Sequence, residues 1–368
     1  MDKIKIIVVD DSAFMRKAVS DIIESESNFE VVAKFRDGRE LIEKVDKYNP
    51  DLITLDVHMK DLDGLATLKE LKRLGKNYPV IMLSSVTTEG SKLTLDCLDS
   101  GAISFITKPS GSISLDIEKV KENLIEQIQS ITSNMKSKVI SRADNTPKYK
   151  LQQNDTLSNV NINKEGNAKQ NNTIVTSKNK KIDAVVIGAS TGGPKALQEV
   201  LTKFPRNLGV PVFVVQHMPE GFTKVFAERL DKACEMKVVE AYDGMKISND
   251  TIYIAKGGRH MTVTSNNLIQ LNEEPPIWGV RPAVDKLFNS AIKVYKGNLV
   301  SAILTGMGRD GADGTANIKD NGGITISEDR STCTIYGMPK AAYETGKVDF
   351  VIPLDQIASS IIKIVKGV

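Results

Sequence analysis

Short apolar runs alternate with helical patterns over the first 136 residues. The runs have little internal polarity, which is typical of strands in a parallel sheet that helices cover on both faces. The predicted strands are Ile4–Val9, Val31–Phe35, Leu52–Leu55, Val80–Leu83 and Ile103–Ile106. Helical spacing appears in Phe14/Ala18/Ile22, Leu65/Leu68/Leu71 and Ile117/Val120/Leu124/Ile128. Residues 1–136 are therefore predicted to form an α/β domain with a parallel five-stranded sheet.

The same alternation returns over residues 182–368. The predicted strands are Ala184–Ile187, Val212–Val215, Ile252–Ala255, Leu299–Leu304 and Ile324–Ser327. The predicted amphipathic helices carry Ala196/Leu197/Val200/Leu201, Phe222/Val225/Phe226/Leu230 and Val284/Leu287/Phe288/Ala291. This pattern predicts a second, doubly wound α/β domain, in which chemistry collects at the carboxyl ends of the strands.

Between the two domains, residues 137–181 keep no helix or strand period. They hold nine Asn, three Gln and eight Lys, with only isolated aliphatic residues. Such a stretch buries too little apolar surface to offset its loss of conformational entropy. We predict a flexible polar linker.

The distribution of charge and the number of cysteines limit which functions are possible. The chain of 368 residues has a net charge of +3, but residues 137–181 contribute +6, so the remainder carries −3. The basic balance therefore belongs to the linker, which disfavours nucleic-acid binding by a folded face. Three scattered cysteines, with no long apolar run and no export signal, favour a cytoplasmic protein without membrane insertion.

Acidic side chains follow two of the N-terminal strands. Asp10 and Asp11 come after the first strand and Asp56 after the third. Parallel strands bring these ends together, and crowded carboxylates are stable only with a cation, for which Mg²⁺ with its oxygen ligands is suited. Ser84 and Lys108 follow the fourth and fifth strands, where a hydroxyl and an ammonium group would bind a phosphoryl group. The competing interpretation is that single strand-end residues cap helices, as Asp11 or Ser12 would for a helix starting near Ala13.

These positions together resemble the response-regulator receiver domain. The resemblance covers about residues 3–125 and lies in Asp10-Asp11, Leu-Asp56-Val-His-Met, Asp63-Gly64, Ser84-Ser85 and Lys108-Pro109. It implies a flavodoxin-like fold and phosphotransfer from a sensor histidine kinase to Asp56. It also implies Mg²⁺ on Asp11, Asp56 and the backbone carbonyl of His58, and a switch aromatic at Phe105. Lys60 departs from the family's usual proline without touching this chemistry.

A G-x-S-x-G sequence follows the first strand of the second domain. In Gly188-Ala189-Ser190-Thr191-Gly192, the serine would lie on a strand–turn–helix elbow, and Pro194 suits the first helical turn. The backbone N–H groups of Thr191 and Gly192 would then form an oxyanion hole.

Other interpretations of this loop compete. A Walker A loop needs lysine where Pro194 stands, and a dinucleotide fingerprint needs glycine where Ser190 stands. A glycine-rich turn with a capping serine stays open on the motif alone.

A serine nucleophile needs a base, and the chain has three histidines. His58 lies in the receiver, and His260 lies in a predicted turn and is expected to be dispensable. His217 follows the strand Val212–Val215, so it shares a sheet edge with Ser190. Asp310, in the glycine-rich loop after Leu299–Leu304, would orient the imidazole. The alternative is that Asp310 caps a helix beginning near Ala312.

Four segments of this half resemble the chemotaxis receptor methylesterase (CheB) family. They are Gly-Ala-Ser190-Thr-Gly-Gly, Gln-His217-Met-Pro-Glu-Gly-Phe-Thr, Arg281-Pro282-Ala-Val-Asp285 and Thr-Gly-Met-Gly-Arg-Asp310-Gly-Ala. The resemblance covers both domains in order, with small departures at Lys256 and Ala283.

The resemblance implies hydrolysis of glutamate γ-methyl esters on methyl-accepting chemoreceptors, and deamidation of specific receptor glutamines. It implies the chemotaxis sensor histidine kinase CheA as phosphodonor, Mg²⁺ in the receiver and no cofactor for hydrolysis. The catalytic prediction is Ser190 as nucleophile, His217 as base and Asp310 as orienter. Two rivals remain: a response regulator with a non-catalytic or DNA-binding output domain, and a general esterase whose receiver is a dimerisation module.

Overall fold

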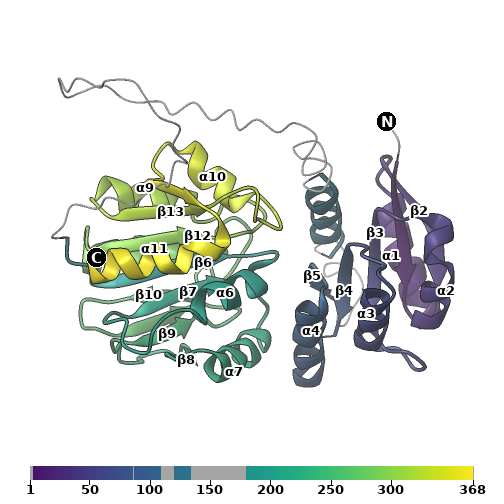
Figure 1. Cartoon of the computed structure of the whole chain (residues 1–368), viewed down its shortest axis with the longest axis horizontal. Helices are drawn as coiled ribbons and strands as arrows, with labels where there is room; N and C mark the ends of the chain where they lie inside the picture. The colour runs from purple at the N-terminus through teal and green to yellow at the C-terminus, as the bar shows by residue number, and fades with distance from the viewer. Residues whose placement is uncertain (1–2, 86, 109–119, 134–179, 368) are drawn as a thin grey trace, which may run out of the picture.

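A computed structural model describes residues 3–85, 87–108, 120–133 and 180–367. Figure 1 shows two α/β units side by side, with the N-terminal unit coloured purple to blue and the C-terminal unit teal to yellow. The predicted linker lies almost wholly outside the described residues, and so does Ile117 of the predicted third helix of the N-terminal unit.

The N-terminal unit is built on a five-stranded sheet. Its strands are β1 (Ile4–Val9), β2 (Phe29–Phe35), β3 (Leu52–Asp56), β4 (Val80–Ser84) and β5 (Ser104–Thr107). They lie in the order β2-β1-β3-β4-β5 and every pairing is parallel. This is the flavodoxin-like order, in which ligand sites form beyond the carboxyl ends of the strands. The predicted fold class is confirmed.

Helices cover both faces of this sheet. They are α1 (Ala13–Glu24), α2 (Gly38–Tyr48), α3 (Gly64–Arg73), α4 (Thr88–Ser100) and a helical segment at 120–133. In β1, Ile6 and Val8 pack against α1 and residues 120–133. Ile7 and Val9 point to the opposite face of the sheet and pack against the helices there. The predicted buried stripe of α1 is displaced by one position, because Val19, Ser20 and Ile23 are buried and Phe14 is 64% exposed.

The C-terminal unit has a seven-stranded sheet in the order β14-β13-β12-β6-β7-β9-β8. All of its pairings are parallel. The strands are β6 (Ala184–Ala189), β7 (Val212–Gln216), β8 (Lys237–Glu240), β9 (Thr251–Ile254), β12 (Leu299–Ile303), β13 (Ile324–Glu328) and β14 (Phe350–Ile352). The chain adds strands on one side of β6 and then returns to the other side, so β6 lies at the switch point where an α/β sheet binds ligands.

Two helical layers enclose this second sheet. The helices are α6 (Gly193–Leu201), α7 (Phe222–Ala233), α8 (Val284–Tyr295), α9 (Ala312–Asp320), α10 (Met338–Glu344) and α11 (Leu354–Lys366). Alternate residues of β6 enter different cores: Val185 and Ile187 share one with α6, α7 and α11, and Ala184 and Val186 share the other with α8 and α10. The predicted apolar stripes of α6 and α8 are confirmed as buried.

A small antiparallel hairpin stands outside the main sheet. Its strands are β10 (His260–Val263) and β11 (Ile269–Asn272). The sequence patterns did not predict this hairpin or the edge strands β8 and β14, because their short apolar runs are interrupted or flanked by polar residues. The hairpin places His260 at the start of a strand, so its predicted placement in a turn is wrong.

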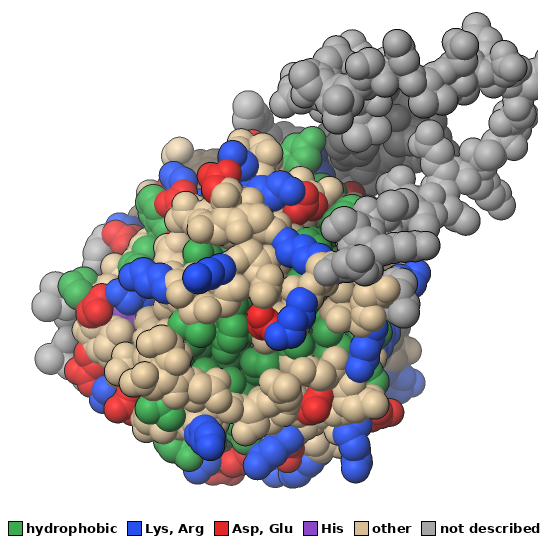
Figure 2. Space-filling view, turned by 90° about the vertical axis from the view of Figure 1, so that its left-hand side faces the viewer, with side chains coloured by type: hydrophobic (Ala, Val, Ile, Leu, Met, Phe, Trp, Pro, Cys, Tyr) green, Lys and Arg blue, Asp and Glu red, His purple; other side chains and the backbone are tan. Residues whose placement is uncertain are grey.

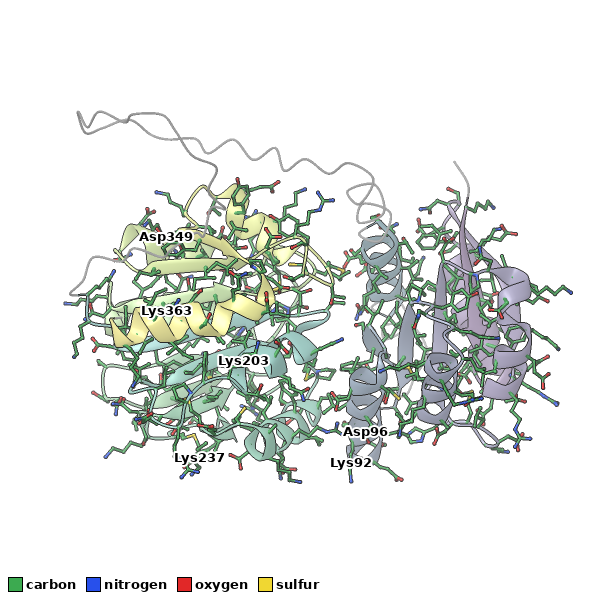
Figure 3. The ribbon with its side chains drawn as sticks, in the orientation of Figure 1. Lys92, Asp96, Lys203, Lys237, Asp349 and Lys363 are labelled. Carbon is green, nitrogen blue, oxygen red and sulfur yellow. The ribbon has the colours of Figure 1, made fainter. Side chains whose placement is uncertain are left out.

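Helix α4 of the receiver packs against α7 and α6 of the second unit. Figure 3 shows Lys92 and Asp96 of α4 on the side that faces this unit. On the far face of the C-terminal unit, Lys and Arg side chains are spread among Asp, Glu and uncharged ones (Figure 2). Among the described residues, none of the helices has the length and apolar composition of a membrane span.

Candidate active site and phosphorylation site

Three adjacent strands deliver the predicted hydrolase residues to one edge of the second sheet. Ser190 follows β6 directly, and His217 follows β7, which is paired with β6. Asp310 lies in the loop between β12, on the other side of β6, and α9. Parallel pairing therefore brings together side chains that are far apart in the sequence.

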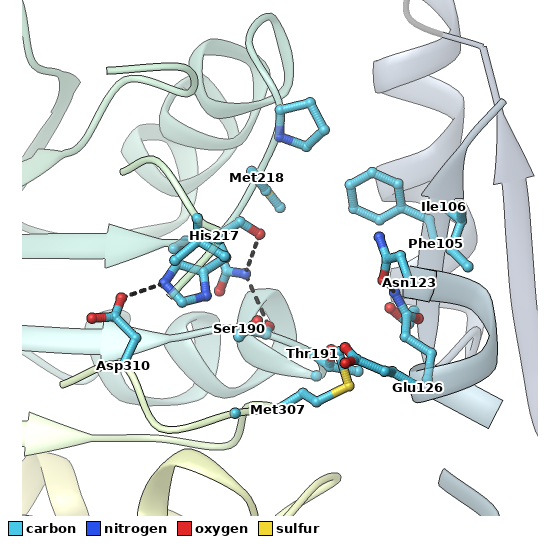
Figure 4. A pocket seen from close by; sticks show the side chains of 18 of the residues that line it. Phe105, Ile106, Asn123, Glu126, Ser190, Thr191, His217, Met218, Met307 and Asp310 are labelled. Atoms are coloured by element: carbon cyan, nitrogen blue, oxygen red, sulfur yellow. Dashed lines mark hydrogen bonds and ion pairs between the residues drawn. The ribbon is translucent and has the colours of Figure 1, made fainter. Parts of the chain in front are cut away.

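His217 and Asp310 form a hydrogen-bonded pair. His217 Nε2 lies 2.8 Å from Asp310 Oδ2 (Figure 4), and the imidazole is 11% exposed while the carboxylate is 2% exposed. A buried carboxylate at this distance fixes the ring orientation and stabilises the imidazolium that forms when the ring takes a proton. With Nε2 bound to Asp310, Nδ1 is the nitrogen left to act as base.

Asp310 does not cap the helix that follows it. Helix α9 begins at Ala312 after Gly311, and among the described residues the Asp310 carboxylate accepts no hydrogen bond from this helix, so the alternative interpretation of Asp310 is wrong. Its carboxylate instead accepts from the first two N–H groups of α8: Oδ2 lies 2.6 Å from Val284 N and Oδ1 lies 2.9 Å from Asp285 N. The positive end of α8 therefore stabilises the negative charge.

Ser190 occupies a tightly bonded turn. Its N–H donates to Thr305 O at 3.0 Å, and its carbonyl accepts from Gly193 N at 2.7 Å. Gln216 Nε2 bridges the turn to the base, donating to Ser190 O at 2.9 Å and His217 O at 3.1 Å. Among the described residues, no hydrogen bond joins Ser190 Oγ to His217, and such catalytic bonds often tighten only with substrate.

The predicted oxyanion-hole residues lie at the start of α6. Gly192 has φ +79°, a left-handed conformation that glycine adopts without strain, and it turns the chain into the helix. Pro194 occupies the first turn of the helix as predicted. In the described part of the chain, the N–H groups of Thr191 and Gly192 make no hydrogen bond, so both remain available to an anion.

His260 does not belong to this cluster. It is fully buried, Nδ1 lies 3.2 Å from Ala283 N, and Nε2 lies 3.0 Å from Pro275 O. Burial lowers the pKa of His260, which favours the neutral ring. His260 supports the segment before α8. That it is dispensable for hydrolysis stays a prediction.

A cavity of about 570 Å³ lies over the serine and is lined by both units. The hydrolase side contributes Ser190, His217, Trp278 and Met307, together with Arg309. The receiver side contributes residues that include Phe105, Asn123 and Glu126, which face the site in Figure 4. The receiver therefore forms one wall of the serine site.

The side-chain contacts between the receiver and the hydrolase unit include a ring stack and an ion-paired arginine. Phe105 stacks on Phe222 with ring centroids 4.7 Å apart and planes at 14°. Arg229 of α7 lies 2.6 Å from Asp96 and 3.1 Å from Asp99, and it also donates to Lys92 O at 2.7 Å. Sequence patterns missed Arg229, because an exposed basic residue on a helix carries no local signal of a partner.

The receiver site joins the predicted acids to the predicted lysine. Lys108 Nζ lies 2.8 Å from both Asp10 Oδ2 and Asp56 Oδ2, and all three side chains are mostly buried. Burial raises the pKa of Asp56, with the positive charge of Lys108 acting against it. Burial acts to lower the pKa of Lys108, but Asp56 and Asp10 outweigh it and the pKa is raised.

The donor set fits a hard divalent cation. Asp10, Asp11 and Asp56 each offer a carboxylate oxygen, and these oxygens lie within 4.8 Å of one another. An all-oxygen set with an exposed member, Asp11, suits Mg²⁺, which keeps several waters. His58 follows β3, and its N–H donates to Asp56 Oδ1 at 3.3 Å. The alternative cap is also confirmed, because Ser12 accepts from Met15 N at the start of α1.

Ser84 links the predicted phosphorylation site to α4. Its hydroxyl lies 2.5 Å from Thr94 Oγ1, and both side chains are fully buried. Lys108 N donates to Ser84 O at 2.7 Å, which ties the fifth strand end to the fourth. Thr94 belongs to the same helix as Asp96 and Asp99, the partners of Arg229.

Family models match both units of the chain. The model described as response regulator receiver domain matches residues 6–118, and the model described as CheB methylesterase matches residues 185–361. The receiver match implies phosphorylation that is typically Mg²⁺-dependent, with a histidine kinase as donor.

Named relatives match nearly the whole chain. The protein-glutamate methylesterase/protein-glutamine glutaminase of Clostridium acetobutylicum is 50% identical over 100% of this chain and 99% of its own. The protein of the same name from Pyrococcus horikoshii is 43% identical over 99% of this chain and 94% of its own. The solved CheB methylesterase catalytic domain of Thermotoga maritima is 42% identical, covers 50% of this chain and 98% of its own, and has a TM-score of 0.49. The chain belongs to the protein-glutamate methylesterase/protein-glutamine glutaminase (CheB) family of response regulators.

Proposed function

We propose that this chain is a phosphorylation-activated serine hydrolase that removes methyl groups from glutamate γ-methyl esters of chemoreceptors and deamidates specific receptor glutamines. The observation that carries the proposal is the buried His217–Asp310 pair beside Ser190, in a cavity whose far wall is a receiver domain. This activity would give adaptation in bacterial chemotaxis. The alternative of a DNA-binding output domain is not supported, since the second unit matches the methylesterase model.

The site geometry supports the following acylation step. His217 Nδ1 takes the hydroxyl proton as Ser190 Oγ attacks the ester carbonyl carbon, while Asp310 stabilises the imidazolium. The oxyanion points to the N–H groups of Thr191 and Gly192, and one such donor contributes ~3–4 kcal/mol to the transition state. The protonated His217 then gives its proton to the departing methoxy oxygen, and methanol leaves.

Deacylation repeats these roles with water. His217 Nδ1 takes a proton from a water molecule that attacks the acyl-serine, and it returns that proton to Ser190 Oγ as the glutamate carboxylate leaves. A glutamine side chain follows the same course with ammonia as the leaving group. Both reactions need only the side chains and backbone groups of this site, with no cofactor.

In the receiver, we propose Asp56 as the phosphoryl acceptor, with CheA as donor. Asp10, Asp11, Asp56 and the carbonyl of His58 would hold Mg²⁺, which supplies charge neutralisation for phosphoryl transfer. Lys108 and Ser84 would then bind phosphoryl oxygens.

The contacts give a route from Asp56 to the hydrolase site. Lys108 is now paired with Asp10 and Asp56, and Ser84 is bonded to Thr94 of α4. A phosphoryl group on Asp56 would draw both side chains toward itself, which removes the Ser84–Thr94 bond and shifts α4. Because α4 carries the partners of Arg229, the receiver would leave the serine site. Raising the open fraction from 1% to about half takes only ~2.7 kcal/mol.

The division into a receiver (1–136), a flexible linker (137–181) and a catalytic domain (182–368) remains part of this proposal, as does a cytoplasmic location. A long flexible linker transmits no strain between its ends, so control would depend on the docking contacts described above.

The experiment is methanol release from methylated receptor membranes, with and without a small phosphodonor. We expect release that rises with phosphodonor and disappears in Ser190→Ala. A matched control is Ser359→Ala, at an exposed serine on α11. Release by Ser190→Ala at the wild-type rate would rule out the serine mechanism. Salt-dependent binding to random duplex DNA would favour the alternative function.

A further inference from the structure

Two buried aspartates cap each other's helices beside the serine site. Asp310, which precedes α9, accepts from the N–H groups of Val284 and Asp285 at the start of α8. Asp285, in the first turn of α8, accepts from Gly314 N at the start of α9, with its Oδ1 2.7 Å away. The arrangement is reciprocal, so neither helix is capped from its own chain segment.

The helices themselves show why this exchange is needed. Helix α8 follows Ala283 and α9 follows Gly311, and neither residue provides a side-chain cap. Helix N-termini leave N–H groups unsatisfied, which is costly when they are buried. A Cβ at Gly314 would lie 2.6 Å from Phe288 Cβ and 3.1 Å from Asp285 Oδ1, so only glycine allows this close approach.

Asp285 also holds a residue of the cavity wall. Its Oδ2 accepts from Trp278 Nε1 at 3.0 Å, although Trp278 is 50% exposed. The Trp278 ring in turn lies under Arg309, whose guanidinium carbon is 4.4 Å from the ring centroid. Arg309 immediately precedes Asp310, so the loop that carries the orienting carboxylate is held on both sides by groups that depend on Asp285.

The charge state of Asp285 agrees with this position. Burial raises its pKa to about 6, with the N–H groups of Gly314 and Gly311 acting in the opposite direction and the charge of Asp310 adding to the rise. At neutral pH it is therefore mostly an anion, held by Gly314 N in α9 and by Trp278 Nε1, as Asp310 is held by the start of α8.

We propose that Asp285 is a positioning residue for the hydrolase site: through α9 and Trp278 it holds Asp310 in the geometry that His217 requires. This inference rests on the proposed function. Asp285 does not touch His217 or Ser190 by any hydrogen bond among the described residues, so its effect on chemistry would pass through Asp310. A displacement of the orienting carboxylate affects the transition state more than substrate binding.

The test is Asp285→Asn in the full-length, phosphodonor-activated protein. We expect kcat for methanol release to fall at least fivefold, with KM within twofold of wild type. The matched control is Asp355→Asn, because Asp355 holds the same position in the first turn of α11 but is exposed. A wild-type kcat in Asp285→Asn would overturn the inference.

A second readout needs no substrate. The His217 Nε2 proton in its bond to Asp310 should give a downfield proton NMR line, assigned by its loss in His217→Gln. We expect this line in the wild type and in Asp355→Asn, and its loss by exchange with water in Asp285→Asn. If Asp285→Asn shows this proton line at the wild-type intensity, the inference is overturned. This readout does not depend on which ester the chain hydrolyses. Failure of the proposed function would instead appear as no methanol release by the wild type.

If Asp285→Asn does not fold, the variant Trp278→Phe tests the inference in its place. This half-exposed position loses only the Nε1 donor and keeps an aromatic ring under Arg309. We expect a kcat about threefold lower and a weakened His217 proton line. Wild-type values for both would overturn the inference.

Discussion

The proposed phosphorylation site and the proposed hydrolase site both lie at the carboxyl edge of a parallel sheet, but they are held together differently. In the receiver, Asp10, Asp56 and Lys108 stand at or next to strand ends and contact each other directly. In the hydrolase unit, Asp310 stands well past the end of β12 and depends on the first turn of α8 for its place. The sheet alone assembles the first site, whereas the second also needs two helix N-termini.

This difference matters for how each site tolerates change. The receiver pairs opposite charges, so removing one carboxylate leaves Lys108 with the other. The hydrolase unit buries two like charges, Asp285 and Asp310, and each is stabilised by backbone N–H groups of a helix. A variant there leaves buried backbone donors without acceptors, and each such donor costs about 1–3 kcal/mol.

The largest expected effect is on the nucleophile. Ser190→Ala should lower methanol release by at least 10⁴-fold, and His217→Gln nearly as far, because members of such a unit act together. Methanol release by Asp310→Asn should fall less, since the proposed nucleophile and base remain. Initial rates on methylated receptor membranes measure all three. Equal losses in Asp310→Asn and in an exposed control such as Asp355→Asn would show that the carboxylate has no special role.

The next effect concerns the receiver site. Asp56→Asn should abolish acid-labile phosphorylation and the activation by phosphodonor, while unphosphorylated activity stays unchanged because Asp56 lies outside the serine site. Labelling with a radioactive phosphodonor, followed by rate measurements, checks both. Wild-type label in Asp56→Asn would move the phosphorylation site elsewhere. Asp11→Ala should weaken Mg²⁺ binding, which titration of the metal measures directly.

A smaller effect is expected where the two units meet. Arg229→Ala removes contacts to Asp96, Asp99 and Lys92 O, and partly exposed ion pairs contribute up to about 1 kcal/mol each. Activity without phosphodonor should therefore rise a few-fold, with little change in the phosphorylated protein. Lys237→Ala, at an exposed lysine of β8, is the control. Unchanged basal activity in Arg229→Ala would mean that this contact does not hold the receiver over the serine.

The smallest effect is a pH dependence of stability. The pKa of Asp285 is about 6 in the folded protein, above its ordinary value of 3.8, so the native state binds this proton more tightly than the unfolded chain. The resulting stabilisation is complete below about pH 4 and is lost as the pH rises through 6. Relative to Asp285→Asn, the wild type should lose on the order of 1–3 kcal/mol of unfolding free energy between pH 4 and 7. Denaturant titrations at pH 4 and pH 7 measure the unfolding free energy of both proteins. The same change with pH in the wild type and in Asp285→Asn would contradict the prediction.

Local sequence determined much of this protein. The strand runs, the stripes of α6 and α8, and the residues at strand ends were predictable because side-chain period and parallel pairing are local or topological rules. Asp10, Asp56, Lys108, Ser190 and His217 were found in this way. The motif Arg281-Pro282-Ala-Val-Asp285 was visible too, but nothing in its sequence gave Asp285 a role.

Only the tertiary structure decided which groups touch. It showed that Asp310 accepts hydrogen bonds from the start of α8 and not of α9, that His260 bonds to Ala283 N before α8, and that Arg229 pairs with α4. The short strands β8, β10, β11 and β14 also emerged only there, because a few residues at an edge carry little period of their own. The physical reason is the same in each case: capping across helices, ion pairing between units and edge pairing depend on groups distant in sequence, which no local pattern specifies.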